Sequence, residues 1–308
     1  MERFQLKRLI RRTLSERFLA DGGIADRVHG QFRTDATAWG ILAWLAAGGE
    51  EERVDTHRAR LIQEQEATGA VSVSKSHPES FWPTGLAILA WQSSSSSQAA
   101  QDRAIHFLIE MSGVHRPPRP DEQVGHDPLL KGWPWVVGTH SWIEPTALNL
   151  LALKIAGYGK HDRVTEAIEM ILNRQLLHGG WNYGNTLVFR RELLPMPEST
   201  GAALTGLAGM IAREKIVKSL SYLQGELAQR STPIALGWTL LGLAAWGLWP
   251  SNAMALVERC LANQSRYGDY DTSALSLLFL GALAGDGDKP FPLFLPSSDK
   301  PSTRAMAG

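Results

Sequence analysis

The sequence predicts an all-α protein in which six inner and six outer helices alternate around a ring, an (α/α)6 toroid. Two observations carry this prediction. One segment recurs six times, apolar nearly all round, which is the pattern of a helix that protein surrounds on every side. A more charged, amphipathic segment precedes each copy, as expected for a helix with one face in water. Strict alternation of the two kinds favours a closed ring whose parallel inner helices all begin at one end.

The elements follow in chain order. Outer helices are expected over residues 2–19, 53–67, 99–111, 162–176, 214–228 and 252–263. The apolar inner copies begin at Thr34, Phe81, Ile143, Pro197, Ser231 and Tyr270. The two longest connections, 112–144 and 177–198, both lead into inner helices, so functional side chains are expected on them. We expect one toroid over residues 1–285 and a proline-rich tail over 286–308.

Composition excludes several functional classes. Lys plus Arg equals Asp plus Glu at 31 each, which leaves no net field to attract nucleic acid. Cys260 is the only cysteine, so neither a disulfide framework nor a multi-thiolate zinc site is expected. No cofactor or metal is expected, because the histidines show no HExxH or HxH spacing. The start of the chain lacks the continuous apolar block of a secretory leader, so a cytoplasmic location is expected.

Residues 231–257 carry no charge, which raises the alternative of a membrane span. Prolines at Pro233 and Pro250 bound the apolar part, and glycines interrupt it, so a buried helix of the ring is the better interpretation. Contact of the basic first helix with a membrane surface stays open as a lesser alternative.

A second signature lies in the outer helices and the turns after them. Gln175, Gly179 and Trp181 form a QxxxGxW motif, and weaker copies occur elsewhere. Together these features resemble the QW repeat of the squalene and oxidosqualene cyclase and protein prenyltransferase β-subunit superfamily. The resemblance implies an α/α toroid and a terpene or polyprenyl cyclase that binds a hydrophobic isoprenoid or lipid. Two alternatives stay open: a prenyltransferase-type subunit, or a non-catalytic module that binds a lipid or a partner peptide.

One column of the repeat alignment is rich in acids. It contains Asp35, Trp82, Glu144, Glu198, Thr232 and Asp271, each at the start of an inner helix. The resemblance places Glu144 where class II cyclases carry their protonating aspartate, although the flanking aspartates of the DxDD motif are missing. We expect Glu144 to be the proton donor, with His140 and Glu198 as companions. Helix capping is the competing interpretation, and it is the stronger one for Asp35 and Asp271.

Aromatic residues surround Glu144 in the sequence and are expected to line a cavity. The expected lining, together with Asp35 and Asp271, is Trp82, Trp133, Trp135, Trp142, Trp181 and Tyr183. For Trp181 the competing interpretation is a loop tryptophan that packs on a helix end and stiffens the ring. Arg190 and Arg191 lie on a long connection and are candidates for binding an anion, or are ordinary solvated charges.

Overall fold

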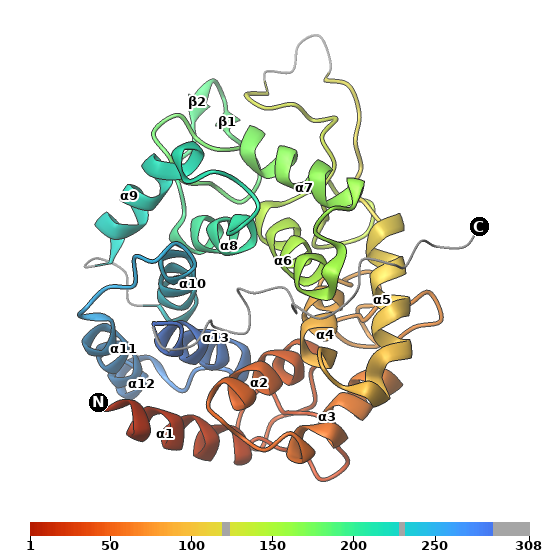
Figure 1. Ribbon diagram of the computed structural model, residues 1–308, viewed down its shortest axis with the longest axis vertical. Helices are drawn as coiled ribbons and strands as arrows, with labels where there is room; N and C mark the ends of the chain where they lie inside the picture. The colour runs from red at the N-terminus through yellow and green to blue at the C-terminus, as the bar shows by residue number, and fades with distance from the viewer. Residues whose placement is uncertain (119–123, 228–231, 286–308) are drawn as a thin grey trace.

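The computed structural model describes residues 1–118, 124–227 and 232–285. Its helices form a closed ring with an inner and an outer layer (Figure 1). The inner helices are α2 (Thr34–Ala46), α4 (Pro83–Trp91), α6 (Ile143–Leu153), α8 (Pro197–Leu207), α10 (Pro233–Ala244) and α13 (Thr272–Leu283). Each inner helix packs against the next in chain order, and α13 packs against α2. The ring is therefore closed, as the sequence predicts.

The outer layer alternates with the inner one. Its helices are α1 (Arg3–Ser15), α3 (Glu52–Gln63), α5 (Gln98–Glu110), α7 (Asp162–Asn173), α9 (Val217–Glu226) and α11 (Ala253–Ala262). A short helix, α12 (Gln264–Tyr267), follows α11, and the hairpin of β1 (Leu187–Val188) and β2 (Arg191–Glu192) lies in the connection between α7 and α8. The expected proline-rich tail, 286–308, lies outside the described residues.

The inner helices form the core because their surfaces are apolar on all sides. Every residue of α4 is buried, and so are ten of the twelve residues of α10. The uncharged segment that raised the membrane alternative forms α10, which is only 12 residues long. In the described part of the chain, no helix combines the length and the apolar character that a membrane crossing requires.

A threonine near the start of four inner helices anchors the incoming loop. In each case the hydroxyl accepts a hydrogen bond from the backbone N–H of a buried apolar residue upstream. The pairs are Thr37 with Ile24 (2.8 Å), Thr84 with Val71 (2.9 Å), Thr146 with Trp133 (2.9 Å) and Thr200 with Trp181 (3.0 Å). This recurring contact fixes where these four inner helices begin, and with it the position of the acid column two residues earlier.

The QxxxGxW motif is a packing device of the ring. Gln175 donates from Nε2 to the hydroxyl of Ser219 on the next outer helix, at 2.7 Å. Gly179 has φ 95°, and a Cβ there would lie 2.5 Å from the carbonyl carbon of Lys218. Trp181 is fully buried and donates from Nε1 to the carbonyl of Ile171 at 2.7 Å. The motif therefore ties each turn to the neighbouring outer helix, whatever the protein does.

Candidate active site

The acids at the starts of the inner helices lie on the side of those helices that faces the inside of the ring. Asp35 on α2 lies four residues before Trp39, so one helix face carries both. The Trp39 ring contacts the Trp238 ring of α10 edge-on, with centroids 5.8 Å apart. Because α13 separates α2 from α10 around the ring (Figure 1), these two rings meet on the inner side of the helices. The column position therefore belongs to the inward side of the ring.

Glu144 and Glu198 form the first acid cluster, at the starts of the adjacent helices α6 and α8. Ser199 donates from its hydroxyl to Oε1 of Glu144 at 2.9 Å. Tyr183 donates from its hydroxyl to Oε1 of Glu198 at 3.2 Å. Both carboxylates are half-buried, and in the described residues neither forms an ion pair within 4 Å of a cation. Two acids thus share one neighbourhood without a neutralising charge.

Burial raises the pKa of Glu144 to about 7. The hydrogen bond from Ser199 opposes this shift, and the nearby charge of Glu198 adds to it. Burial and the Glu198 carboxylate also raise the pKa of the Tyr183 hydroxyl. A carboxyl that keeps its proton up to near-neutral pH, beside a second carboxylate, is an arrangement that can support general acid–base catalysis.

Two aromatic pairs involve the residues that precede α4 and α6. Trp142, the residue before α6, stacks on His140 with ring centroids 4.5 Å apart. Trp82 packs edge-on against Trp135 with centroids 5.2 Å apart. These four rings and Tyr183 keep some exposed surface. Flat exposed rings with a polar edge can pack against a ligand and hydrogen-bond it at the same time.

Two tryptophans expected in a cavity lining instead have no exposed surface. Trp133 and Trp181 are both fully buried. Trp133 donates from Nε1 to the carbonyl of Leu108 at 3.0 Å, which joins the long connection to α5. Both rings therefore act as packing between loop and outer helix, the competing interpretation that the sequence offered for Trp181.

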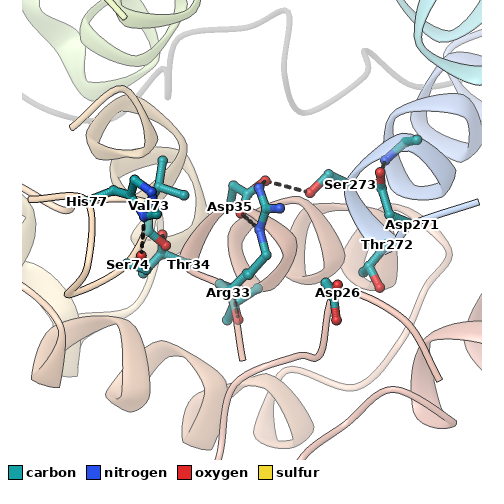
Figure 2. Close-up of polar contacts among 12 residues, drawn as sticks. Asp26, Arg33, Thr34, Asp35, Val73, Ser74, His77, Asp271, Thr272 and Ser273 are labelled. Atoms are coloured by element: carbon teal, nitrogen blue, oxygen red, sulfur yellow. Dashed lines mark hydrogen bonds and ion pairs between the residues drawn. The ribbon is translucent and has the colours of Figure 1, made fainter. Parts of the chain in front are cut away.

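Asp35 and Asp271 form a second acid cluster with a different character (Figure 2). Arg33 binds Asp35 through both ends of its guanidinium, at 2.9 and 2.8 Å, and Ser273 donates to Asp35 at 2.9 Å. Asp271 caps α13 by accepting from the N–H of Ala274 at 2.8 Å. These two acids are therefore engaged in an ion pair and a helix cap.

The other predicted residues lie further out. His140 is exposed, and in the described residues no hydrogen bond joins it to Glu144. Its pKa is lowered by burial of the ring and by the charge of Arg174. Arg190 and Arg191 are exposed at the tip of the β1–β2 hairpin. The sequence reasoning missed Ser199, which directly follows Glu198, and Arg174, for which no pattern in the sequence gives a signal.

The fold and the paired acids define an α/α toroid with a candidate acid–base centre at the starts of its inner helices. No family model matches the chain, and no curated protein matches it. Among solved structures it is similar to an inactive variant of the α-1,6-mannanase GH76A of Salegentibacter sp. HEL1_6, in complex with α-1,6-mannotriose. That match has a TM-score of 0.61 and 10% identity and covers 92% of this chain and 99% of that chain. An α-amylase from Clostridium perfringens matches with a TM-score of 0.57 and 11% identity, over 95% of this chain and 98% of that chain.

These neighbours correct the functional expectation drawn from the QW-like motifs. The ent-copalyl diphosphate synthase from Streptomyces platensis matches with a TM-score of 0.51 and 15% identity, over 85% of this chain but only 50% of that chain. The neighbours covered along nearly their whole length include several glycoside hydrolases. The prediction of the squalene-cyclase superfamily, with an isoprenoid or lipid ligand, was wrong. The two alternatives, a prenyltransferase-type subunit and a module that binds a lipid or a peptide, were wrong as well. The physical reason is that the motif serves the packing of the toroid, and toroids host many activities.

Proposed function

We propose that the protein processes carbohydrate by hydrolysing glycosidic bonds, with Glu144 as the general acid. The observation that carries the proposal is the pairing of a buried carboxyl whose pKa is about 7 with a second carboxylate on the adjacent helix. Glycoside hydrolysis in most families uses two carboxyl groups, one of which must hold a proton for the leaving oxygen. The glycoside hydrolases among the structural neighbours support the same class of chemistry.

Each residue has a role in this proposal. Glu144 protonates the glycosidic oxygen as the bond to the anomeric carbon breaks. Glu198 acts on the opposite side of the sugar, where it activates water or attacks the anomeric carbon, and Tyr183 orients it through the 3.2 Å hydrogen bond. Ser199 holds the Glu144 carboxyl in place. Trp142 and Tyr183 offer ring faces against which a sugar can pack.

The arrangement differs from that of one neighbour. Inactive variants of the α-1,6-mannanase carry substitutions of two consecutive aspartates. In this chain the two proposed carboxylates come from separate helices, α6 and α8. The test of this proposal therefore covers several sugars and linkages.

The test compares the wild-type protein with Glu144→Gln on a panel of oligosaccharides that includes α-1,6-linked mannosides. Product release is followed by chromatography and mass spectrometry. We expect Glu144→Gln to lose about 10²- to 10⁴-fold in rate, the usual contribution of a general acid. Glu169→Gln is the matched control, because Glu169 is exposed on α7. Unchanged turnover in Glu144→Gln, or no turnover of any glycan by the wild type, would refute the proposal.

A further inference from the structure

Arg174, the C-cap residue that directly follows α7, is a buried cation with few partners. Only 3% of its surface is exposed. Its Nη1 atom donates to the carbonyl of Ser141 at 2.5 Å, and its buried Nε atom has no hydrogen-bond partner. Among the described residues no carboxylate lies within ion-pair distance of it. Within the described residues the bond from Nη1 is therefore its one hydrogen bond to the protein, and the buried Nε–H has no acceptor.

Two other buried arginines have more partners than Arg174, although each also keeps one guanidinium nitrogen without a hydrogen bond. Arg58 pairs with Glu51 and Asp55, at 2.6 and 3.2 Å. Arg163 donates to three backbone carbonyls, and Glu166 lies 3.5 Å away. A buried guanidinium that lacks such partners costs several kcal/mol. Burial lowers the pKa of Arg174 to about 10, so the group still carries its charge at neutral pH.

The surroundings of Arg174 are positive as well. Burial lowers the pKa of His115, the charges of Arg163, Arg174 and Lys131 lower it further, and among the described residues Glu166 is the carboxylate that opposes them. Glu166 is itself shared between Arg163 and Lys131. Lys131 lies on the connection that leads into α6, Arg163 is in α7 and Arg174 directly follows α7, so three described cations act on one place. Such a field attracts an anion.

The cation lies beside the candidate active site. The Ser141 carbonyl that Arg174 binds belongs to the residue just before Trp142, the N-cap of α6. Gly184 lies against the same group: a Cβ there would be 3.4 Å from Nη1 of Arg174 and 3.5 Å from the Trp142 ring. The neighbouring Tyr183 reaches Glu198 with its hydroxyl. A ligand that packs on Trp142 and Tyr183 can therefore extend toward the guanidinium.

We propose that Arg174 binds an oxyanion substituent of the glycan, so that the substrate is an acidic oligosaccharide. The substituent is a uronic-acid carboxylate or a sulfate or phosphate ester, since each offers the paired oxygens that a guanidinium fork binds. This inference rests on the proposed carbohydrate function and names the substrate class of the same site. An incoming oxyanion would supply the acceptors that the buried N–H groups lack. Gly184 matters because any larger side chain would occupy the space beside Nη1.

Binding is measured by calorimetry in the Glu144→Gln background, so that no turnover is needed. The probes are trigalacturonate, sulfated and phosphorylated trisaccharides, and a neutral trisaccharide of matched length. We expect one charged class to bind better than the neutral one. We expect Arg174→Gln to weaken that binding about 10- to 100-fold, as for a charge-assisted pair, and to change the neutral probe by less than about 3-fold. Arg174→Lys, a point charge without the fork, should fall between.

Two further variants keep the test decisive. Arg190→Gln removes an exposed charge from the nearby hairpin and should leave the preference intact, whereas a loss there would reassign the anion site to the hairpin. Gly184→Ala adds a methyl group at ordinary contact distance from Arg174, so the fold is retained while the approach to the guanidinium narrows. This substitution should weaken the binding of the charged probes several-fold. If Arg174→Gln does not fold, an unchanged charge preference in Gly184→Ala overturns the inference.

The outcomes separate this inference from the proposed function. Equal affinity for charged and neutral probes, or equal loss of both in Arg174→Gln, overturns the anion site and leaves glycan hydrolysis standing. Charge-selective binding by a wild-type protein that hydrolyses no glycan refutes the hydrolase proposal while the anion site survives.

Discussion

The two acid clusters occupy the same position of the repeat, but only the cluster of Asp35 contains a cation that pairs with the acid. Asp35 on α2 and Glu144 on α6 both accept a hydrogen bond from a serine of the neighbouring inner helix, Ser273 and Ser199, each at 2.9 Å. Two residues before Asp35 stands Arg33, which binds it with both ends of its fork. Two residues before Glu144 stands Trp142, which supplies no charge. The residue two positions before the acid therefore differs between the clusters: with arginine there the acid forms an ion pair, and with tryptophan there the acid is a carboxyl whose pKa is about 7.

The difference shows how equivalent positions of a repeat can acquire different electrostatic environments. Every inner helix presents its first turn to the same end of the fold, and an acid there is favoured by the helix dipole. A partner cation turns that acid into a structural contact. At Glu144, where no cation is paired with the acid, burial raises the pKa of the carboxyl.

The largest effect is expected from removing the cation of the ion pair. Arg33→Met leaves the Asp35 side chain, which is only 4% exposed, without its counter-charge. We expect a loss of about 3 kcal/mol in the free energy of unfolding, at the low end for a buried pair because Arg33 is 44% exposed. Urea denaturation measures it. Arg27→Met is the matched control, since its pair with Asp26 is exposed and should cost below about 1 kcal/mol. An equal loss in the free energy of unfolding in the two variants would contradict the contrast between the two acid clusters.

A smaller effect is expected in the pH dependence of stability. The pKa of Glu144 is raised from 4.5 to about 7 by folding, so between these values the folded state holds a proton that the unfolded state has released. Stability from this group is present below pH 4.5 and is lost as the pH rises through 7. Relative to the wild type, Glu144→Gln should gain about 2 kcal/mol between pH 5 and pH 8. Thermal unfolding across that range measures the gain, and parallel curves for the two proteins would contradict it.

The smallest effects are expected from removing the two serine hydroxyl groups that donate to Glu144 and Asp35. Ser199→Ala removes the hydrogen bond that holds the pKa of Glu144 down, so that pKa should rise above 7 by about half a unit to one unit. NMR titration of the glutamate side chains, or the alkaline limb of a rate profile, follows the shift. Ser273→Ala should cost only about 1 kcal/mol of stability, because Arg33 still binds Asp35. A titration of Glu144 unchanged by Ser199→Ala would remove Ser199 from the site.

Local sequence patterns determined the ring itself. Apolar all-round segments alternating with amphipathic ones are decided by burial, a property that each segment carries in its own residues. The alignment of the repeats was also visible in the sequence, because a threonine recurs at the same place in four segments: Thr37, Thr84, Thr146 and Thr200. Each threonine hydroxyl accepts a hydrogen bond from the loop before its helix. Helix ends were less accurate: the outer helix expected over 214–228 begins as a 3-10 turn, Arg213–Ile216, before α9 starts at Val217.

Only the tertiary structure decided which acids could act. The sequence placed Asp35, Glu144, Glu198 and Asp271 in one column, but it did not show that Ser199 reaches Glu144 across 55 residues of chain, or that Arg174 binds the carbonyl of Ser141. A pKa depends on burial and on charges brought close by folding, and neither is a property of neighbouring residues in the chain. The repeat therefore determined the scaffold, while burial and the contacts between distant side chains determined the environment of each acid.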